Sequence, residues 1–254
     1  MSKNILFTGA GGIGNEQIWQ ILKKKYNLFF CDNRVENVDP IIPKNKIFKI
    51  TKVNSKNYLN EIQKLCKKCD INLIVPGIDE ELLKLSKNKK ILPKLFLPNY
   101  ETIKICNNKW NLYNFCIKKK IDVPLTSLAE NFNKNKHTGK VILKPIYGRG
   151  SKGILISKNL QETKLILNLL KQKKLLSKYL IQDFINGTEY TITCANIRNK
   201  NYIFPLKVIE KKGITIKAIY EKQPELIKVI HKLNSIFNRQ TILNIQLIKK
   251  KNKF

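Results

Sequence analysis

The sequence predicts an α/β fold for the first part of the chain and an α+β fold for the second. In the first part, short apolar runs alternate with amphipathic segments of helical spacing, a pattern typical of a parallel sheet with crossover helices. In the second part, glycines separate two apolar runs, Val141–Leu143 and Ile154–Ile156, which predicts a hairpin. With 254 residues, 43% of them apolar, the chain can bury cores for two domains of ordinary size.

The expected elements of the first part follow from the N-terminus in order. Strands are expected at Ile5–Thr8, Leu28–Cys31, Ile47–Ile50 and Leu73–Val75. Helices are expected at Glu16–Lys25, Tyr58–Lys68 and Glu80–Ser86. Further on, a helix is expected over Pro224–Phe237. The proline in Leu97–Asn99 marks a boundary, so we expect domains at residues 1–98 and 99–254.

Glycines follow the first expected strand in a characteristic spacing. Gly9, Gly11 and Gly14 form G-x-G-x-x-G before a helix, and Asp32 ends the next expected strand. This is a Rossmann-like fingerprint, and by itself it favours an NAD(P)-dependent oxidoreductase or epimerase. The Tyr-x-x-x-Lys pair of many such enzymes is not found at Tyr113 or Tyr179.

A second glycine loop lies between the strands of the predicted hairpin. Gly148, Gly150 and Gly153 have no Cβ, so the loop, which also contains Ser151, can close its amides over a polyphosphate. Lys144 ends the apolar strand before the loop, where a lysine is out of keeping with its neighbours unless it has an anionic partner. Together these features predict an ATP site.

The residues around this loop exclude two other interpretations of it, a Walker loop and the glycine-rich loop of a protein kinase. A Walker loop needs Gly-Lys-Ser/Thr at the start of a helix, whereas here a strand follows Ser151–Gly153. A protein kinase needs His-Arg-Asp and Asp-Phe-Gly segments, and the sequence has neither. The remaining alternative is a flexible hairpin that binds no ligand.

Six motifs in this order resemble the ATP-grasp superfamily, in the branch of the carbamoyl-phosphate synthase large chain and related carboxylate–amine ligases. They are Ile5–Gly14, Leu73–Leu85, Asn107–Thr126, Val141–Gly153, Ile181–Thr191 and Leu243–Leu247. The resemblance implies a Rossmann-like N-terminal domain followed by an ATP-grasp domain, with the nucleotide clamp at about residues 124–190.

The resemblance also implies which residues bind ATP. They are Lys109, Lys144, Gly148, Gly150, Ser151, Gly153, Gln182, Asp183, Phe184, Ile185 and Glu189. The two lysines are expected on the phosphates, and the backbone of 183–185, expected on a strand, beside adenine. Asp183 and Glu189 are the candidates for the ribose hydroxyls, because a carboxylate accepts two hydrogen bonds from a diol. No catalytic residue is assigned.

The implied reaction uses ATP and Mg²⁺ to activate a small-molecule carboxylate as an acylphosphate, which an amine or similar nucleophile then attacks. The sequence identifies neither substrate. It also departs from the family pattern: Gln246 matches an amide ligand of the metal, but the strand with the acidic ligands would lie beyond Phe254. We therefore expect an incomplete Mg²⁺ site and an incomplete ATP-grasp domain. A fragment of a longer ligase, a degenerate gene product and a chain completed by a partner all fit, and truncation is favoured.

Lysine dominates the composition, with a net charge of +31. This charge makes a basic nucleic-acid-binding module an alternative. The lysines are scattered in triplets, at 23–25, 118–120 and 249–251, and the sequence lacks an RNP1 motif. We therefore expect a solvated surface and no specific nucleic-acid partner.

The cysteines and histidines add no predicted site. Cys66 and Cys69 form an isolated C-x-x-C, which does not predict zinc, and free thiols suit a reducing compartment. His137 and His231 have no nucleophilic partner visible in the sequence and are assigned no catalysis. Without an apolar signal or membrane-spanning run, we expect a cytoplasmic protein with no membrane partner, and a homodimer is left open.

Overall fold

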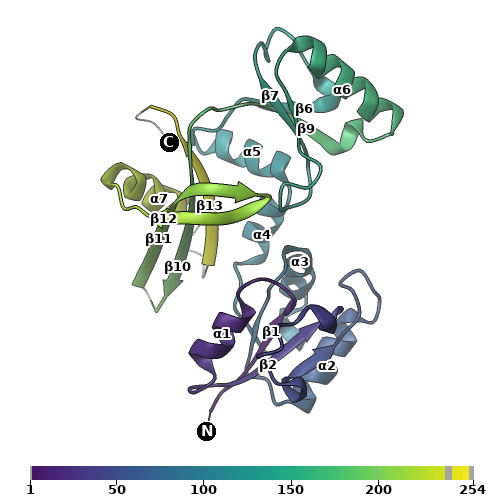
Figure 1. The fold of residues 1–254 in the computed structure, drawn as a ribbon, viewed down its shortest axis with the longest axis vertical. Helices are drawn as coiled ribbons and strands as arrows, with labels where there is room; N and C mark the ends of the chain where they lie inside the picture. The colour runs from purple at the N-terminus through teal and green to yellow at the C-terminus, as the bar shows by residue number, and fades with distance from the viewer. Residues whose placement is uncertain (1, 199, 238–241, 252–254) are drawn as a thin grey trace. The chain divides into compact units, whose positions relative to one another are not determined.

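The computed structural model describes residues 2–198, 200–237 and 242–251. The chain forms two compact units, Met1–Ile103 and Lys104–Phe254, and each is described by itself. Figure 1 shows the elements of both units along the chain. Short 3-10 helices occupy Val35–Asn37, Lys44–Lys46, Lys89–Ile91, Ala129–Asn131 and Leu176–Lys178.

The first unit contains a five-stranded parallel sheet, which confirms the predicted α/β alternation. Its strands are β1 (Asn4–Thr8), β2 (Asn27–Asp32), β3 (Ile47–Lys49), β4 (Leu73–Val75) and β5 (Lys94–Leu95), in the order β3-β2-β1-β4-β5. The helices are α1 (Asn15–Leu22), α2 (Tyr58–Lys68) and α3 (Asp79–Lys87). Helix α1 ends three residues before the expected Lys25, because the amides of Lys25 and Tyr26 turn back to the carbonyl of Leu22.

This sheet is buried on both faces, as parallel sheets are. Leu6 of β1 belongs to a core cluster with Ile62 and Leu65 of α2. Its neighbours Ile5 and Phe7 belong to a second cluster on the other face of the sheet. The near-continuous apolar runs of the central strands follow from this double burial.

A buried carboxylate joins three elements at the carboxyl end of β1. Glu81 accepts hydrogen bonds from Thr8 Oγ1 at 2.5 Å, from the hydroxyl of Tyr58, and from the amides of Gly77 at 3.1 Å and Ile78 at 3.2 Å. Burial raises the pKa of Glu81, and these hydrogen bonds partly offset the cost of burying its charge. The cluster fixes the turn between β4 and α3 against β1 and α2.

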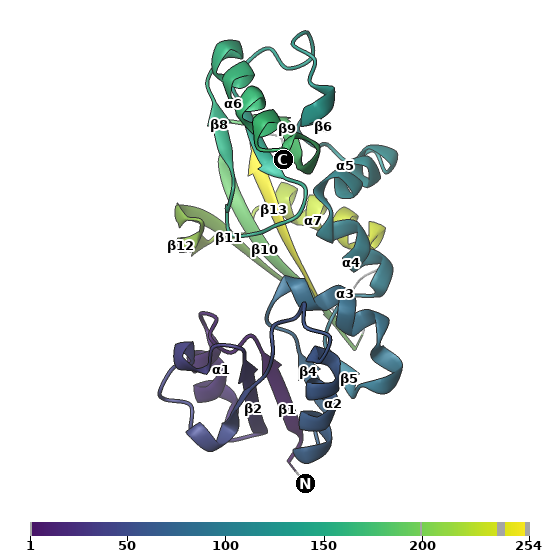
Figure 2. The same cartoon turned by 90° about the vertical axis from the view of Figure 1, so that its right-hand side faces the viewer.

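The second unit begins within helix α4 (Tyr100–Asn107) and continues with a further helix and a four-stranded antiparallel sheet. Helices α4 (Tyr100–Asn107) and α5 (Lys109–Lys118) precede strands β6 (Thr126–Leu128), β7 (Val141–Pro145), β8 (Leu155–Ser157) and β9 (Tyr179–Asp183). The order is β6-β9-β7-β8. Helix α6 (Leu160–Gln172) packs along this sheet in both views of the ribbon (Figures 1 and 2). The predicted hairpin is confirmed, with β7 and β8 paired on either side of the glycine loop.

The rest of the second unit is a second antiparallel sheet covered by one helix. Its strands are β10 (Thr188–Ile197), β11 (Lys200–Lys212), β12 (Ile214–Tyr220) and β13 (Ile242–Lys249), in the order β12-β11-β10-β13. Helix α7 (Pro224–Ile236), predicted from the sequence, packs Leu226 and Ile230 against Tyr190 and Ile192 of β10.

The turn after β4 yields a steric prediction about Gly77. A Cβ at Gly77 would lie 2.1 Å from the carbonyl oxygen of Thr8, whereas one at Gly139 would meet nothing within 4 Å. Neither glycine has a left-handed backbone, so the two substitutions to alanine differ only in the room available for the added Cβ. We expect Gly77→Ala to lower the free energy of unfolding by about 2–4 kcal/mol and Gly139→Ala to change it by less than about 0.5 kcal/mol. Urea denaturation of both variants measures this, and equal stabilities would contradict the close approach of the turn to β1.

Candidate functional site

Three polar side chains lie in a row on one face of the β6-β9-β7-β8 sheet. Thr126 of β6 lies directly opposite Gln182 of β9, and Gln182 lies opposite Ile142 of β7. Lys144 is two residues beyond Ile142, so it shares that face. On the opposite face, Val141, Leu143 and Ile181 form a core with Leu170 of α6. We call Thr126, Gln182 and Lys144 the polar row.

Lys144 is the charged member of the polar row. Its Nζ donates to Oε1 of Gln182 at 2.8 Å, and no carboxylate partner is recorded for it among the described residues. Burial, and secondarily the charge of Lys109, lowers the pKa of Lys144 from 10.5 to about 8. A partly buried ammonium with only an amide for a partner is a position at which an anion would bind favourably.

The glycine loop begins immediately after Lys144's strand. Gly148, Gly150 and Gly153 all have positive φ, and Ser151 does as well, at 57°. A Cβ at Gly148 or Gly150 would enter open space, so there the backbone angle alone requires glycine. At Gly153 a Cβ would also lie 2.9 Å from the hydroxyl of Tyr179. Ser151 Oγ donates to the carbonyl of Gly213 at 3.2 Å, which supports the unusual angle of Ser151.

Lys109 contacts the same loop from the start of α5. Its backbone amide donates to the carbonyl of Ile146 at 3.1 Å, and its Nζ donates to the carbonyl of Gly148 at 2.7 Å. The preceding residue, Asn108, caps α5 by accepting from the amides of Trp110 and Asn111. The cap fixes the start of α5, and therefore the position of Lys109. Lys109 and Lys144 thus lie at the same glycine loop.

Asp183 lies on the other face of the sheet from the polar row. It pairs with Val141, whose side chain is in the core beside α6, and its Oδ1 is 2.7 Å from Nδ1 of His137. Nε2 of His137 is 2.7 Å from Oγ of Ser127. The ribose role expected for the Asp183 side chain is therefore not supported by its direction. His137, for which no partner was visible in the sequence, has two.

The Ser127–His137–Asp183 arrangement has the connectivity of a hydrolase triad, but its exposure is reversed. His137 is 3% exposed, and the Asp183 side chain is 38% exposed. A nucleophilic triad needs an accessible serine and a shielded acid. The cluster instead ties residues 133–138 to the end of β9, which is a structural role.

The segment expected to contact adenine differs from its predicted structure. Strand β9 ends at Asp183, so Phe184 and Ile185, which were expected on a strand, lie beyond it. The amide of Phe184 still donates to the carbonyl of Lys140 at 2.9 Å, one position past the last β7–β9 pair and in the same register. The ammonium of Lys140 lies 3.8 Å from the centroid of the Phe184 ring. The two residues form a short link between β9 and β10.

Glu189 and Gln246 lie on the second sheet, on the face opposite α7. Tyr190 and Ile192 contact α7, so Glu189 and Thr191 face the other way, and Gln246 of β13 lies opposite Thr191. Glu189 forms an ion pair with Lys211. Gln246 is exposed and has no recorded polar contact among the described residues.

The donors around Gln246 do not fit a Mg²⁺ site by themselves. The same-face neighbours of Gln246 on β10 and β13 include Thr191 and Asn244, which are neutral, and Glu189, which is paired with Lys211. Within the described ranges no cluster of three or more His, Cys, Asp or Glu residues is suited to hold a metal ion. A hard cation prefers several oxygen ligands that include carboxylates. Thr191, Asn244 and Gln246 supply only uncharged oxygens, and the one carboxylate beside them, that of Glu189, is already paired with Lys211.

The glycine turn of the first unit is occupied by its own side chains. Asp32 accepts from the amide of Gly11 at 2.9 Å and from the amide of Arg34 at 2.8 Å, so both carboxylate oxygens are engaged. A Cβ at Gly11 would lie 2.9 Å from Cβ of Asn37. This crowding does not favour a dinucleotide. Tyr100 and Lys104 of α4 do have the Tyr-x-x-x-Lys spacing, which Tyr113 and Tyr179 lack.

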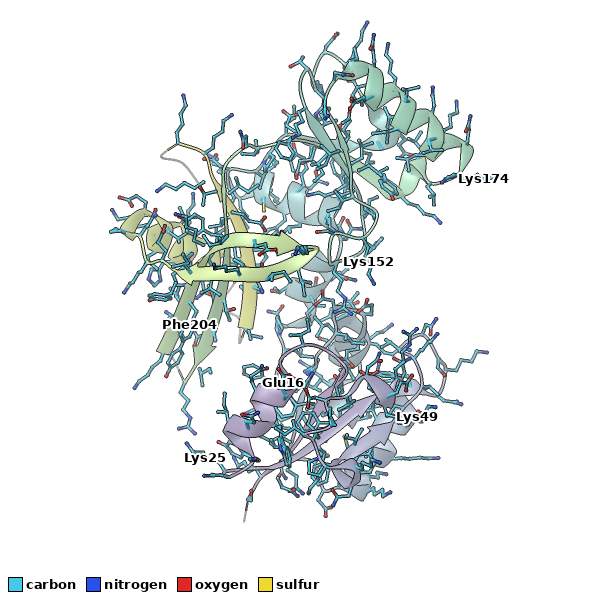
Figure 3. The ribbon with its side chains drawn as sticks, viewed as in Figure 1. Glu16, Lys25, Lys49, Lys152, Lys174 and Phe204 are labelled. Carbon is cyan, nitrogen blue, oxygen red and sulfur yellow. The ribbon has the colours of Figure 1, made fainter. Side chains whose placement is uncertain are left out.

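The surface charge and the thiols agree with the sequence-based expectations of scattered lysines and free cysteines. Lys25, Lys49, Lys152 and Lys174 extend outward from different elements (Figure 3). All six cysteines are free thiols. Among the described residues, no helix is long and apolar enough to cross a membrane.

Comparisons with known families cover most of the chain. A model of the ATP-grasp domain matches residues 106–251, more than half of the chain. A model of the PylC-like N-terminal domain matches residues 5–95. No curated protein sequence matches the chain.

Solved structures share the fold at low sequence identity. Carboxyaminoimidazole ribonucleotide synthase from Aspergillus clavatus, complexed with ATP, has a TM-score of 0.78 and 11% identity over 100% of this chain and 68% of that one. L-amino acid ligase from Bacillus licheniformis has a TM-score of 0.73 and 13% identity, over 99% of this chain and 64% of that one. The biotin carboxylase domain of Hydrogenobacter thermophilus 2-oxoglutarate carboxylase, complexed with MgADP, has a TM-score of 0.72 and 13% identity, over 100% of this chain and 62% of that one. The chain thus spans about two thirds of the length of these proteins.

The environment of Lys144 predicts an unusually acidic ammonium. Pulsed labelling of amines over a pH series, followed by mass spectrometry, should give Lys144 a midpoint near pH 8. Lys109→Met should raise this midpoint, because the substitution removes a nearby positive charge. Lys118→Met, at the exposed end of α5, is the matched control and should leave it unchanged. If Lys144 titrates like the exposed lysines, the described burial is wrong.

Proposed function

The chain belongs to the ATP-grasp family, and we propose on this basis that it binds ATP at the polar row and glycine loop and acts as an ATP-dependent carboxylate–amine ligase. One observation carries the proposal: among the described residues, Lys144 is a partly buried cation with only an amide partner, beside a loop whose glycines allow close backbone approach. A triphosphate supplies the negative charge that this site lacks.

The residues of the site have distinct proposed roles. Lys144 and Lys109 attract the phosphates, and the amides of Gly148–Gly153 donate to phosphate oxygens. Binding would replace the contact of Lys109 Nζ with the neutral carbonyl of Gly148 by a stronger contact with a negatively charged phosphate oxygen. The glycines with open space around them permit that rearrangement of the loop.

The nucleoside half of the ligand is proposed to lie at the link after β9. Gln182, through its backbone, and the backbone of Asp183–Ile185 contact adenine, with the Phe184 and Ile185 side chains beside the ring. Glu189 accepts from the ribose hydroxyls once it is released from Lys211. Asp183 takes part through its backbone only, because its carboxylate is held by His137.

The proposed reaction has two steps. A substrate carboxylate attacks the γ-phosphorus of ATP and releases ADP, which gives an acylphosphate; an amine or similar nucleophile then displaces phosphate. Similar structures are complexed with ADP and 5-aminoimidazole ribonucleotide or with bicarbonate, which supports small-molecule substrates here. Mg²⁺ is proposed to accompany ATP, with Gln246 as one amide contact. Since the described donors do not fit a complete metal site, no step is assigned to the ion.

Finer features of the proposal rest on resemblance. These are a first domain of Rossmann-like type at residues 1–98, a nucleotide clamp within 99–254, kinship with the carbamoyl-phosphate synthase branch, and a cytoplasmic protein. Because one similar protein is described as a dimer, a homodimer is retained as part of the proposal. The NAD(P) alternative is not favoured, since Asp32 already accepts from two amides of its own turn region.

Calorimetric titration with ATP tests the nucleotide site. We expect saturable ATP binding that Lys144→Met weakens by roughly 10–100-fold, because a charge-assisted hydrogen bond to phosphate is lost. Lys118→Met should bind like the wild type. NAD and an oligonucleotide serve as competing ligands; saturable NAD binding without ATP binding would overturn the proposal.

The pKa of Lys144 adds a pH dependence to the same titration. ATP favours protonated Lys144, so the lysine's contribution is complete below its pKa of about 8 and is lost as the pH rises above it. Above about pH 7.5 the triphosphate charge is constant, so affinity should fall towards pH 9.5 in the wild type. Affinity for Lys144→Met should not fall in this range. A pH-independent affinity in the wild type would remove Lys144 from the site.

A further inference from the structure

Thr126 occupies the end of the polar row farthest from Lys144. It is 4% exposed and lies on β6, one strand beyond Gln182. Its Oγ1 donates to the carbonyl of Pro124 at 2.8 Å and accepts from Nε2 of Gln182 at 2.6 Å. Oε1 of Gln182 then accepts from Nζ of Lys144 at 2.8 Å. An unbroken chain of hydrogen bonds therefore runs from a loop carbonyl to the ammonium.

The direction of this chain follows from donor counting. A threonine hydroxyl has one hydrogen, and here the carbonyl of Pro124 takes it, since a carbonyl can only accept. Towards Gln182 the hydroxyl can therefore only accept, so it faces the NH₂ group of the amide. The carbonyl end of Gln182 is left to face Lys144. The amide orientation, which electron density alone seldom decides, is thus fixed by its neighbours.

We propose that Thr126 is a positioning residue for nucleotide binding, which acts through Gln182 to hold the ammonium of Lys144 in place for the phosphates. This inference rests on the proposed function. A hydroxyl at residue 126 keeps the amide from rotating, so Lys144 has one fixed acceptor beside the glycine loop. Without this hydroxyl, the partly buried NH₂ group of Gln182 has no acceptor, and the amide rotates towards another one.

A merely structural threonine would affect stability and leave ligand binding unchanged. Thr163 provides the matched control, because it is also buried and hydrogen-bonded, to Ser157 and the carbonyl of Asn159, but lies on α6. Thr126→Val keeps the shape of the side chain and removes the hydroxyl. Thr126→Ser keeps the hydroxyl and serves as the conservative rescue.

The test is a double-mutant cycle on ATP affinity in the full chain. Thr126→Val should weaken ATP binding by about tenfold, while Thr126→Ser and Thr163→Val bind like the wild type. In a Lys144→Met background, Thr126→Val should have little further effect, because the group that it positions is gone. Equal affinity of Thr126→Val and wild type, or an undiminished loss in the Lys144→Met background, would overturn the proposal.

A second measurement separates this inference from the proposed function. Pulsed amine labelling requires no nucleotide, and Thr126→Val should shift the labelling midpoint of Lys144 to lower pH, because a fixed acceptor stabilises the charged ammonium. Should the wild type not bind ATP, the proposed function fails while the labelling shift still tests the hydrogen-bond chain. An unchanged midpoint in Thr126→Val contradicts the positioning role.

Discussion

A cation that is partly buried without a carboxylate partner is the constraint on which the site depends. Removing an ammonium from water costs free energy unless a counter-charge accompanies it, and in the described part of the chain Lys144 has only the amide of Gln182 as a partner. The lowered pKa of Lys144 expresses that cost. An anionic ligand would offset that cost, so the burial of Lys144 favours the binding of a phosphate. The glycine loop beside Lys144 is consistent with such a ligand.

Strand register decides which side chains take part. Gln182 and Asp183 are neighbours in the sequence, yet alternation sends Gln182 to the polar row and Asp183 to the face covered by α6. The same rule puts Glu189 on the face opposite α7, while Tyr190 packs under the helix. In each sheet, therefore, one face forms a core under a helix and the other carries the polar side chains of the proposed site.

Much of the local structure was predictable from sequence, and the tertiary partners of the site were not. Periodicity and glycines predicted four of the five strands of the first unit, all but the two-residue β5, together with the β7–β8 hairpin and Lys144 at its edge, because these depend on short-range patterns. The partner of Asp183 was missed, since His137 reaches it from 46 residues away through a loop without regular structure. Asp32 matched a motif, but its engagement by Gly11 and Arg34 depends on the fold of the turn.

Hydrogen exchange of the full chain, with and without saturating ATP, is the most direct test of a nucleotide site at the polar row. The account predicts slower exchange for the amides of the glycine loop, Tyr147–Gly153, and of the link Phe184–Gly187. It predicts no change at the glycine turn Gly9–Gly14 of the first unit. Unchanged exchange in the loop, or protection confined to Gly9–Gly14, would contradict it.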